Sequence, residues 1–171
     1  MDRLTPEKRS WNMSRIKSKD TTPERIVRSF LHRNGFRFRL HVKDLPGKPD
    51  IVLPKYKTVI EVRGCFWHAH SDCKYAKIPT TNSEWWENKL KQNQKRDEQN
   101  IEALLNENWK VLVIWDCLFK KSKSCNISRV GQGIVDNVKF FVNSQDVYQE
   151  ICFEEQLIYS NPSSMTMKEE L

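Results

Sequence analysis

Hydrophobic residues recur along the chain at two spacings, and each spacing predicts one kind of element. Residues 21–34 carry apolar side chains at helical spacing. They begin with a threonine that can cap a helix and a proline suited to a first turn. Gly35 can adopt the left-handed conformation that ends many helices. The pattern therefore predicts a helix over residues 21–34.

Three short segments have the patterns of strands. Residues 36–41 alternate between large apolar and charged side chains, which predicts a half-buried strand. Residues 51–53 and 58–63 follow a proline-rich turn and predict two more strands. Because successive strand residues point to opposite faces, Glu61 and Arg63 are expected on one face.

The second half of the chain alternates helix and strand. Residues 81–84 predict a cap for a long polar helix over residues 84–108. The apolar run 110–116 predicts a strand covered on both faces, and residues 127–141 fit an amphipathic helix. This order predicts an α/β fold, with helices on both sides of a central mixed sheet.

The chain has 171 residues, which is the length of one domain with its own core. We expect a basic, partly helical arm over residues 1–20 and a core over residues 21–120. A helical extension over residues 121–159 and a disordered tail over residues 160–171 complete this division. No segment resembles a signal peptide or membrane span, so we expect a cytoplasmic protein without a membrane partner.

The charge and the cysteine content of the chain narrow the range of partners and cysteine chemistry to be expected. Lys and Arg outnumber Asp and Glu by 29 to 22, which favours a polyanionic partner such as nucleic acid but does not prove one. Five cysteines without a secretory signal favour metal binding over disulfides.

One segment carries most of the residues that bind zinc in proteins. Cys65, His70 and Cys73 lie within nine residues, and Cys117 follows the buried strand. Four such ligands make a structural zinc site, with His68 as a rival for the place of His70. The alternative is that the cysteines are small core residues.

A second group of residues suits phosphodiester cleavage. Asp50 precedes one strand and Glu61 lies on the next, so carboxylates for Mg²⁺ lie near each other. Arg63 would stabilise negative charge in the transition state, and His68 can act as a general base. The alternative is that these are ordinary surface charges.

Phe66 and Trp67 are adjacent between these two groups. Two large aromatic side chains in one loop can wedge between base pairs, or they can pack in the core over the zinc site.

The segment GCFWHAHSDC at residues 64–73, read with PGKPD at 46–50 and WDC at 115–117, resembles the very short patch repair (Vsr) endonucleases. The resemblance implies a restriction-endonuclease-like fold with one structural zinc. It implies a Mg²⁺-dependent monomer that nicks double-stranded DNA beside a T:G mismatch left by deaminated 5-methylcytosine. Mismatch-repair proteins are possible partners, and the enzyme would act at the nucleoid.

The resemblance also assigns roles by position. Asp50 and the main-chain carbonyl of Val62 would bind Mg²⁺, and His68 would be the general base. Glu24 would support this site. His70, rather than His68, would complete the zinc ligands Cys65, Cys73 and Cys117.

The DNA contacts implied by the resemblance come from three parts of the chain. Met13 in the arm would intercalate together with Phe66 and Trp67. Lys89 and Asn93, one turn apart on the long helix, would read base edges.

Two residues depart from the better-known members of this family. Val62 and Arg63 stand where those members have threonine and histidine. Arg63 keeps a cation but loses a proton donor, and Glu61 becomes a candidate second Mg²⁺ ligand. These changes leave two alternatives: a zinc-stapled protein that binds distorted DNA without cleaving it, or a related nuclease with a different target.

Overall fold

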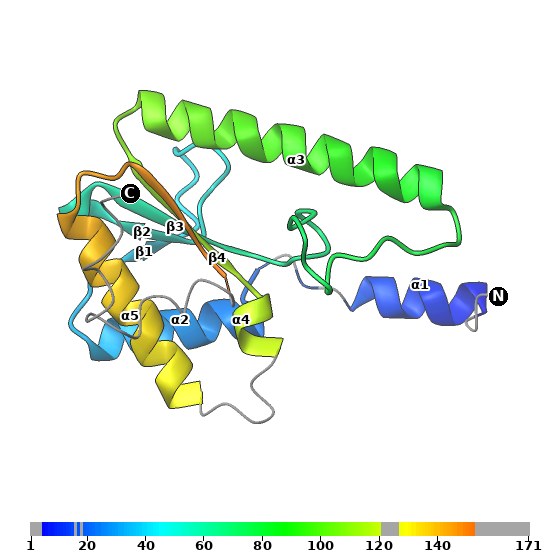
Figure 1. The fold of residues 1–171 in the computed structure, drawn as a ribbon, viewed down its shortest axis with the longest axis horizontal. Coiled ribbons are helices and arrows are strands. Elements are labelled where there is room, and N and C mark those ends of the chain that lie inside the picture. The colour runs from blue at the N-terminus through cyan, green and yellow to red at the C-terminus, as the bar shows by residue number, and fades with distance from the viewer. Residues whose placement is uncertain (1–4, 16, 18, 121–126, 153–171) are drawn as a thin grey trace, which may run out of the picture.

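The computed structural model describes residues 5–15, 17, 19–120 and 127–152. They form a mixed sheet with helices on both sides (Figure 1). The strands are β1 (Arg39–Leu40), β2 (Ile51–Leu53), β3 (Thr58–Arg63), β4 (Lys110–Trp115) and β5 (Tyr148–Ile151), in this order across the sheet. The helices are α1 (Pro6–Ser14), α2 (Thr22–Arg33), the 3-10 turn η1 (Pro54–Tyr56), α3 (Ser83–Asn106), α4 (Cys117–Lys120) and α5 (Ile127–Asn143). β1, β2 and β3 pair antiparallel, whereas β4 and β5 run parallel to β3.

The two faces of the sheet bury different helices. α2 and α5 pack on one face against strand residues such as Ile60 and Leu112. α3 lies along the other face, where Val59 and Val111 are buried (Figure 1). All four side chains are 0% exposed, so β4 is covered on both faces as predicted. The predicted fold class is confirmed.

The first predicted helix is confirmed as α2. Thr21 accepts a bond from the Glu24 backbone N–H, and the Glu24 carboxylate accepts from the Thr21 backbone N–H, which completes a capping box. Gly35 follows the helix with a φ of +84°, as its predicted role requires. The capping box fixes Glu24 at the start of the helix.

The strand predicted over residues 36–41 is only partly correct. Only Arg39 and Leu40 pair with β2, which is three residues long. Phe36 is buried by packing against Tyr56, with ring centroids 5.7 Å apart, and Leu40 is 42% exposed. His41 ends the strand with a φ of +46°.

Three further features differ from or extend the predictions. α3 begins after Asn82, which adopts a left-handed conformation and makes no side-chain cap bond, so the predicted cap is wrong in its mechanism. β5 was not predicted, and α5 together with β5 belongs to the same core as the rest of the sheet. The arm contains the helix α1, capped by Thr5.

Part of the predicted division of the chain lies outside the described residues. This applies to the tail over residues 160–171 and to residues 121–126 and 153–159 of the predicted extension. The division at residues 20 and 120 stays a prediction. Among the described helices, none is both long and apolar enough to span a membrane.

Candidate active site and metal centre

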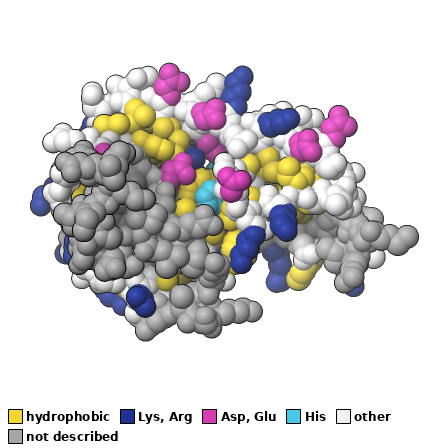
Figure 2. Space-filling model, in the orientation of Figure 1, with side chains coloured by type: hydrophobic (Ala, Val, Ile, Leu, Met, Phe, Trp, Pro, Cys, Tyr) yellow, Lys and Arg dark blue, Asp and Glu magenta, His cyan; other side chains and the backbone are white. Residues whose placement is uncertain are grey.

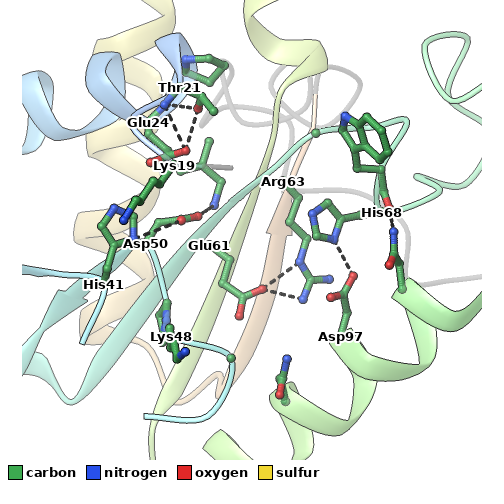
Figure 3. Close-up of a pocket in the computed structure, with 18 of the residues that line it drawn as sticks. Lys19, Thr21, Glu24, His41, Lys48, Asp50, Glu61, Arg63, His68 and Asp97 are labelled. Atoms are coloured by element: carbon green, nitrogen blue, oxygen red, sulfur yellow. Dashed lines mark hydrogen bonds and ion pairs between the residues drawn. The ribbon is translucent and has the colours of Figure 1, made fainter. Parts of the chain in front are cut away.

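An open groove lies between α3 and the start of α2, beside β3 (Figure 3). Acidic side chains line it, namely Glu24, Asp50, Glu61, Asp97 and Asp116. Basic side chains line it as well, namely Lys17, Lys19, Lys43, Lys48, Arg63 and Arg96. In the space-filling view a histidine is exposed near the middle of one face, with acidic side chains around it and basic ones nearby (Figure 2). This mixture of charges suits a phosphodiester backbone that is bound together with a cation.

Asp50 is held at the groove by the sheet itself. It directly precedes β2, whose antiparallel register with β3 brings it beside Val62. The Val62 backbone N–H donates to Asp50 Oδ2 at 2.8 Å. Burial, together with the nearby charges of Glu24 and Glu61, raises the pKa of Asp50 to about 6, although the Val62 bond opposes this shift. A divalent cation would relieve the repulsion among these carboxylates.

Glu24 is 2% exposed, so its carboxylate lies within the protein beside the groove. It accepts bonds from the Asp20 backbone N–H at 2.9 Å and from the Thr21 hydroxyl at 2.8 Å. Arg28, one turn along α2, donates to it at 2.7 Å. Every one of these partners is supplied by α2 or by the residues just before it.

Glu61 and Arg63 share a face of β3, as predicted, and this is the face under α3. Arg63 Nε donates to Glu61 Oε2 at 2.8 Å, and Arg63 Nη2 lies 2.6 Å from the same oxygen. Arg63 is only 7% exposed. Because a buried guanidinium needs a counter-charge, the pair is neutral overall and Arg63 is fixed in orientation.

His68 contacts a residue that the sequence analysis missed. Its Nδ1 lies 2.5 Å from Asp97 Oδ2, a carboxylate of α3 (Figure 3). Burial acts to raise the pKa of Asp97, but the bond to His68 and the charges of Arg63 and Arg96 outweigh it and lower that pKa. An ionised Asp97 accepts from Nδ1–H, so Nε2 of His68 is left as the acceptor nitrogen.

The four predicted zinc ligands come together. Ligand atoms of Cys65, His70, Cys73 and Cys117 all lie within 4.8 Å of one another. Nδ1 of His70 is 3.4 Å from the Cys65 sulfur and 3.8 Å from the Cys117 sulfur. Tetrahedral zinc, with bonds of about 2.0 Å to nitrogen and 2.3 Å to sulfur, places such ligand atoms about 3.5 Å apart. The set therefore fits zinc, and His68 is not part of it.

An aromatic cluster lies beside the groove, and Trp67 is its member that lines the groove. Phe66 and Trp67 contact each other and both contact Trp86 of α3, with ring centroids 5.1 to 6.0 Å apart. All three are half-buried. Trp86 was missed because nothing in its local pattern shows that α3 returns to the loop after β3. Its neighbour Trp85 is 58% exposed.

The remaining predicted DNA contacts have different surroundings. Met13 lies on α1 and is 42% exposed. Lys89 is exposed on α3, whereas Asn93 is 8% exposed and donates to the Trp67 carbonyl at 3.0 Å. Asn93 thus holds the aromatic loop in place, and its role as a base reader stays a prediction.

A mixed sheet flanked by helices, with carboxylates and a histidine in an open groove lined by basic residues, is the arrangement of a nuclease. Residues 1–75 match the family model for DNA mismatch endonuclease Vsr. The chain is 48% identical over 116 residues to the type II nicking enzyme V.XorIIP of Xanthomonas oryzae pv. oryzae, covering 68% of this chain and 85% of that protein. It is 44% identical over 139 residues to V.NmeAIP of Neisseria meningitidis serogroup A, covering 80% and 99%.

The DNA mismatch endonuclease Vsr of Escherichia coli is 40% identical to this chain over 112 residues, covering 66% of this chain and 71% of that protein. The chain therefore belongs to the Vsr family of DNA mismatch endonucleases and related nicking enzymes. The resemblance found in the sequence is confirmed, and the protein is an endonuclease.

Proposed function

We propose that this endonuclease nicks one DNA strand beside a T:G mismatch in a Mg²⁺-dependent reaction, as in very short patch repair of deaminated 5-methylcytosine. The observation that carries the proposal is that Asp50 and the His68–Asp97 pair line the same open groove. A metal-binding carboxylate and an oriented general base are the two parts that water-driven cleavage of a phosphodiester requires.

The oxygen atoms around Asp50 fit Mg²⁺. Asp50 Oδ1 is not used by the bond from Val62, and the Val62 carbonyl and the Glu61 carboxylate are the other proposed ligands. All are hard oxygen donors, which Mg²⁺ prefers. When bound, the cation supplies charge neutralisation at the phosphate and the leaving oxygen.

The protein side chains perform the remaining steps. His68 accepts a proton at Nε2 from the attacking water, because Asp97 holds Nδ1–H and aligns the ring. Arg63, held in orientation by Glu61, would donate hydrogen bonds from its guanidinium to the phosphate. Glu24 supports the site by binding Arg28 beside it.

Zinc at Cys65, His70, Cys73 and Cys117 has a structural role in this proposal. All four donors are protein side chains, which leaves no open position for substrate. The ring of His70 stacks on Trp115 with centroids 4.0 Å apart, so the site fixes the loop to the end of β4. That loop carries His68 and the aromatic wedge.

Recognition of the mismatch is assigned to the aromatic residues. Phe66 and Trp67, with Met13 from the arm, would enter the base stack at the mismatch, where unstacking costs least. Lys89 and Asn93 are proposed to contact base edges. The half-buried cluster with Trp86 gives the wedge a rigid base. We propose that the enzyme acts as a monomer on the double-stranded DNA.

The test is a nicking assay on an end-labelled duplex with one T:G mismatch, run beside the fully paired duplex. Wild type and Asp50→Ala are compared with Mg²⁺ and with its omission, since strong chelators would also remove zinc. A single nick beside the T that needs both Mg²⁺ and Asp50 supports the proposal. Tight mismatch binding without any nick would favour a non-cleaving DNA-binding protein, and equal cleavage of both duplexes would indicate a nuclease with another target.

A further inference from the structure

A second polar cluster lies between α2 and the loop that follows β1. Ligand atoms of Asp20, Glu24 and His41 lie within 4.8 Å of one another, a spacing that would suit a cation. The guanidinium of Arg28 is the cation at this place. It contacts Asp20, donates to Glu24 at 2.7 Å and lies 3.0 Å from His41 Nε2. This cluster therefore binds an arginine side chain instead of a metal.

The contact with Arg28 determines the tautomer of His41. A guanidinium can only donate hydrogen bonds and does not lose its proton in proteins. His41 Nε2 must therefore be the acceptor, and the ring proton lies on Nδ1. This nitrogen is 3.8 Å from Asp50 Oδ1, the carboxylate oxygen that the Val62 bond leaves free (Figure 3).

The separation is longer than a hydrogen bond, yet it places an N–H dipole beside a largely buried carboxylate. The side chain of Arg28 is 11% exposed, and the side chains of His41 and Asp50 are 27% and 22% exposed, so water screens this field weakly. His41 also has a φ of +46°, a backbone conformation that costs about 1 kcal/mol in a non-glycine residue. The strained residue is thus the one that lies between Arg28 and Asp50.

We propose that His41 is a positioning residue for Asp50. Arg28 holds its imidazole with Nδ1–H toward Oδ1, and this contact keeps the Asp50 carboxylate turned to present that oxygen to the divalent cation. The inference rests on the proposed function, because it assumes a metal at Asp50. Residues that orient metal ligands typically change metal affinity or activity by about 10- to 100-fold when removed.

Two amide variants of His41 test the roles of its two ring nitrogens, Nδ1 and Nε2, one at a time. In His41→Asn the amide nitrogen occupies the place of Nδ1, whereas in His41→Gln the amide lies near Nε2 and can still accept from Arg28. We expect His41→Ala and His41→Gln to raise the Mg²⁺ concentration for half-maximal nicking about tenfold. His41→Asn should recover most of the wild-type value.

The variants should rank in the same way when metal binding is measured directly, without cleavage of DNA. Mn²⁺ binding is measured by calorimetry on the zinc-loaded protein, with a T:G duplex that carries a cleavage-resistant linkage. We expect weaker Mn²⁺ binding by about tenfold for His41→Gln than for His41→Asn. Thermal unfolding of the metal-free variants measures separately how much asparagine gains from its tolerance of the left-handed backbone at this position.

Asp50→Ala distinguishes the two proposals. If wild type makes no nick at the T:G mismatch, the proposed function is wrong. If wild type nicks and Asp50→Ala nicks with unchanged Mg²⁺ dependence, the metal assignment at Asp50 is wrong and the His41 inference falls with it. If Asp50→Ala is inactive but all His41 variants bind metal like wild type, only the His41 inference is overturned. Recovery by glutamine instead of asparagine would also overturn it, because the contact with Arg28 would then be the one that matters.

Discussion

Replacing Asp50 by asparagine should stabilise the metal-free protein while abolishing nicking. Asparagine keeps the shape of the side chain and an oxygen that can accept from the Val62 N–H. It removes a charge that the fold disfavours, since burial and the nearby acids raise the pKa of Asp50 to about 6 from its ordinary 3.8. At about 1.4 kcal/mol per pKa unit, the ionised carboxylate costs the folded state about 3 kcal/mol above pH 7.

The sign of the pH dependence follows from linkage. The folded state binds the Asp50 proton more tightly than the unfolded state, because the pKa of Asp50 is higher in the folded state. The free energy of unfolding therefore falls as pH rises from about 4 through about 6. The advantage of Asp50→Asn should therefore be about 3 kcal/mol at pH 8 and about half of that at pH 5.

Urea unfolding at pH 5, 6, 7 and 8 in Mg²⁺-free buffer measures this difference. Adding Mg²⁺ at pH 8 should stabilise wild type and leave Asp50→Asn unchanged, because a ligand that binds only the folded state raises its stability. A variant that is less stable than wild type, or a difference independent of pH, would refute the reasoning.

Three further predictions concern other parts of the site. Cys117→Ser should lose bound zinc, measured by atomic absorption, and unfold at a lower temperature; a folded, metal-free variant of normal stability would contradict the zinc assignment. Asp97→Asn should reduce the nicking rate about 10²- to 10⁴-fold without changing the Mg²⁺ requirement, because the amide no longer holds the His68 proton on Nδ1 and leaves Nε2 unable to accept; an altered Mg²⁺ requirement at normal rate would argue against this role. Trp86→Ala should weaken preference for T:G over paired DNA in competition binding, whereas Trp86→Phe, which keeps an aromatic ring against Phe66 and Trp67, should lose less. Unchanged preference in Trp86→Ala would show that the aromatic cluster does not position the wedge.

Features fixed by local sequence could be predicted. The capping box of Thr21 and Glu24 depends on residues three apart, and the buried strand 110–116 depends on a continuous apolar run. Three of the four zinc ligands lie in one loop, so their spacing alone indicated a metal site. Glu61 and Arg63 are two residues apart on one strand, so the alternation of strand side chains was enough to place them on one face.

Contacts that depend on packing between distant elements could not be predicted. Asp97 is one of several charged residues on a polar helix, and only the placement of α3 over β3 brings it to His68, 29 residues away in the chain. The contact of Arg28 with His41 similarly depends on how α2 docks beside the loop after β1. β5 has a mixed polar sequence, and its pairing with β4 requires α5 to cross between them.

Glu61 and Arg63 on β3 are best understood as one ion pair. A buried arginine without a counter-charge is strongly unfavourable, and Glu61 supplies that charge by contacting both Nε and Nη2 of Arg63. Glu61→Gln alone should therefore destabilise the protein by about 3–5 kcal/mol, whereas the double variant Glu61→Gln, Arg63→Met should lose much less.

Urea unfolding of the two single variants and the double variant measures this coupling, and nicking at varied Mg²⁺ tests a metal role separately. Additive losses would show that the two residues do not act as a pair. A normal Mg²⁺ requirement in the double variant would leave Glu61 as the counter-charge of Arg63 and exclude it as a metal ligand. A raised requirement would mean that Glu61 serves both, with Oε2 bound to Arg63 and Oε1 left for the cation.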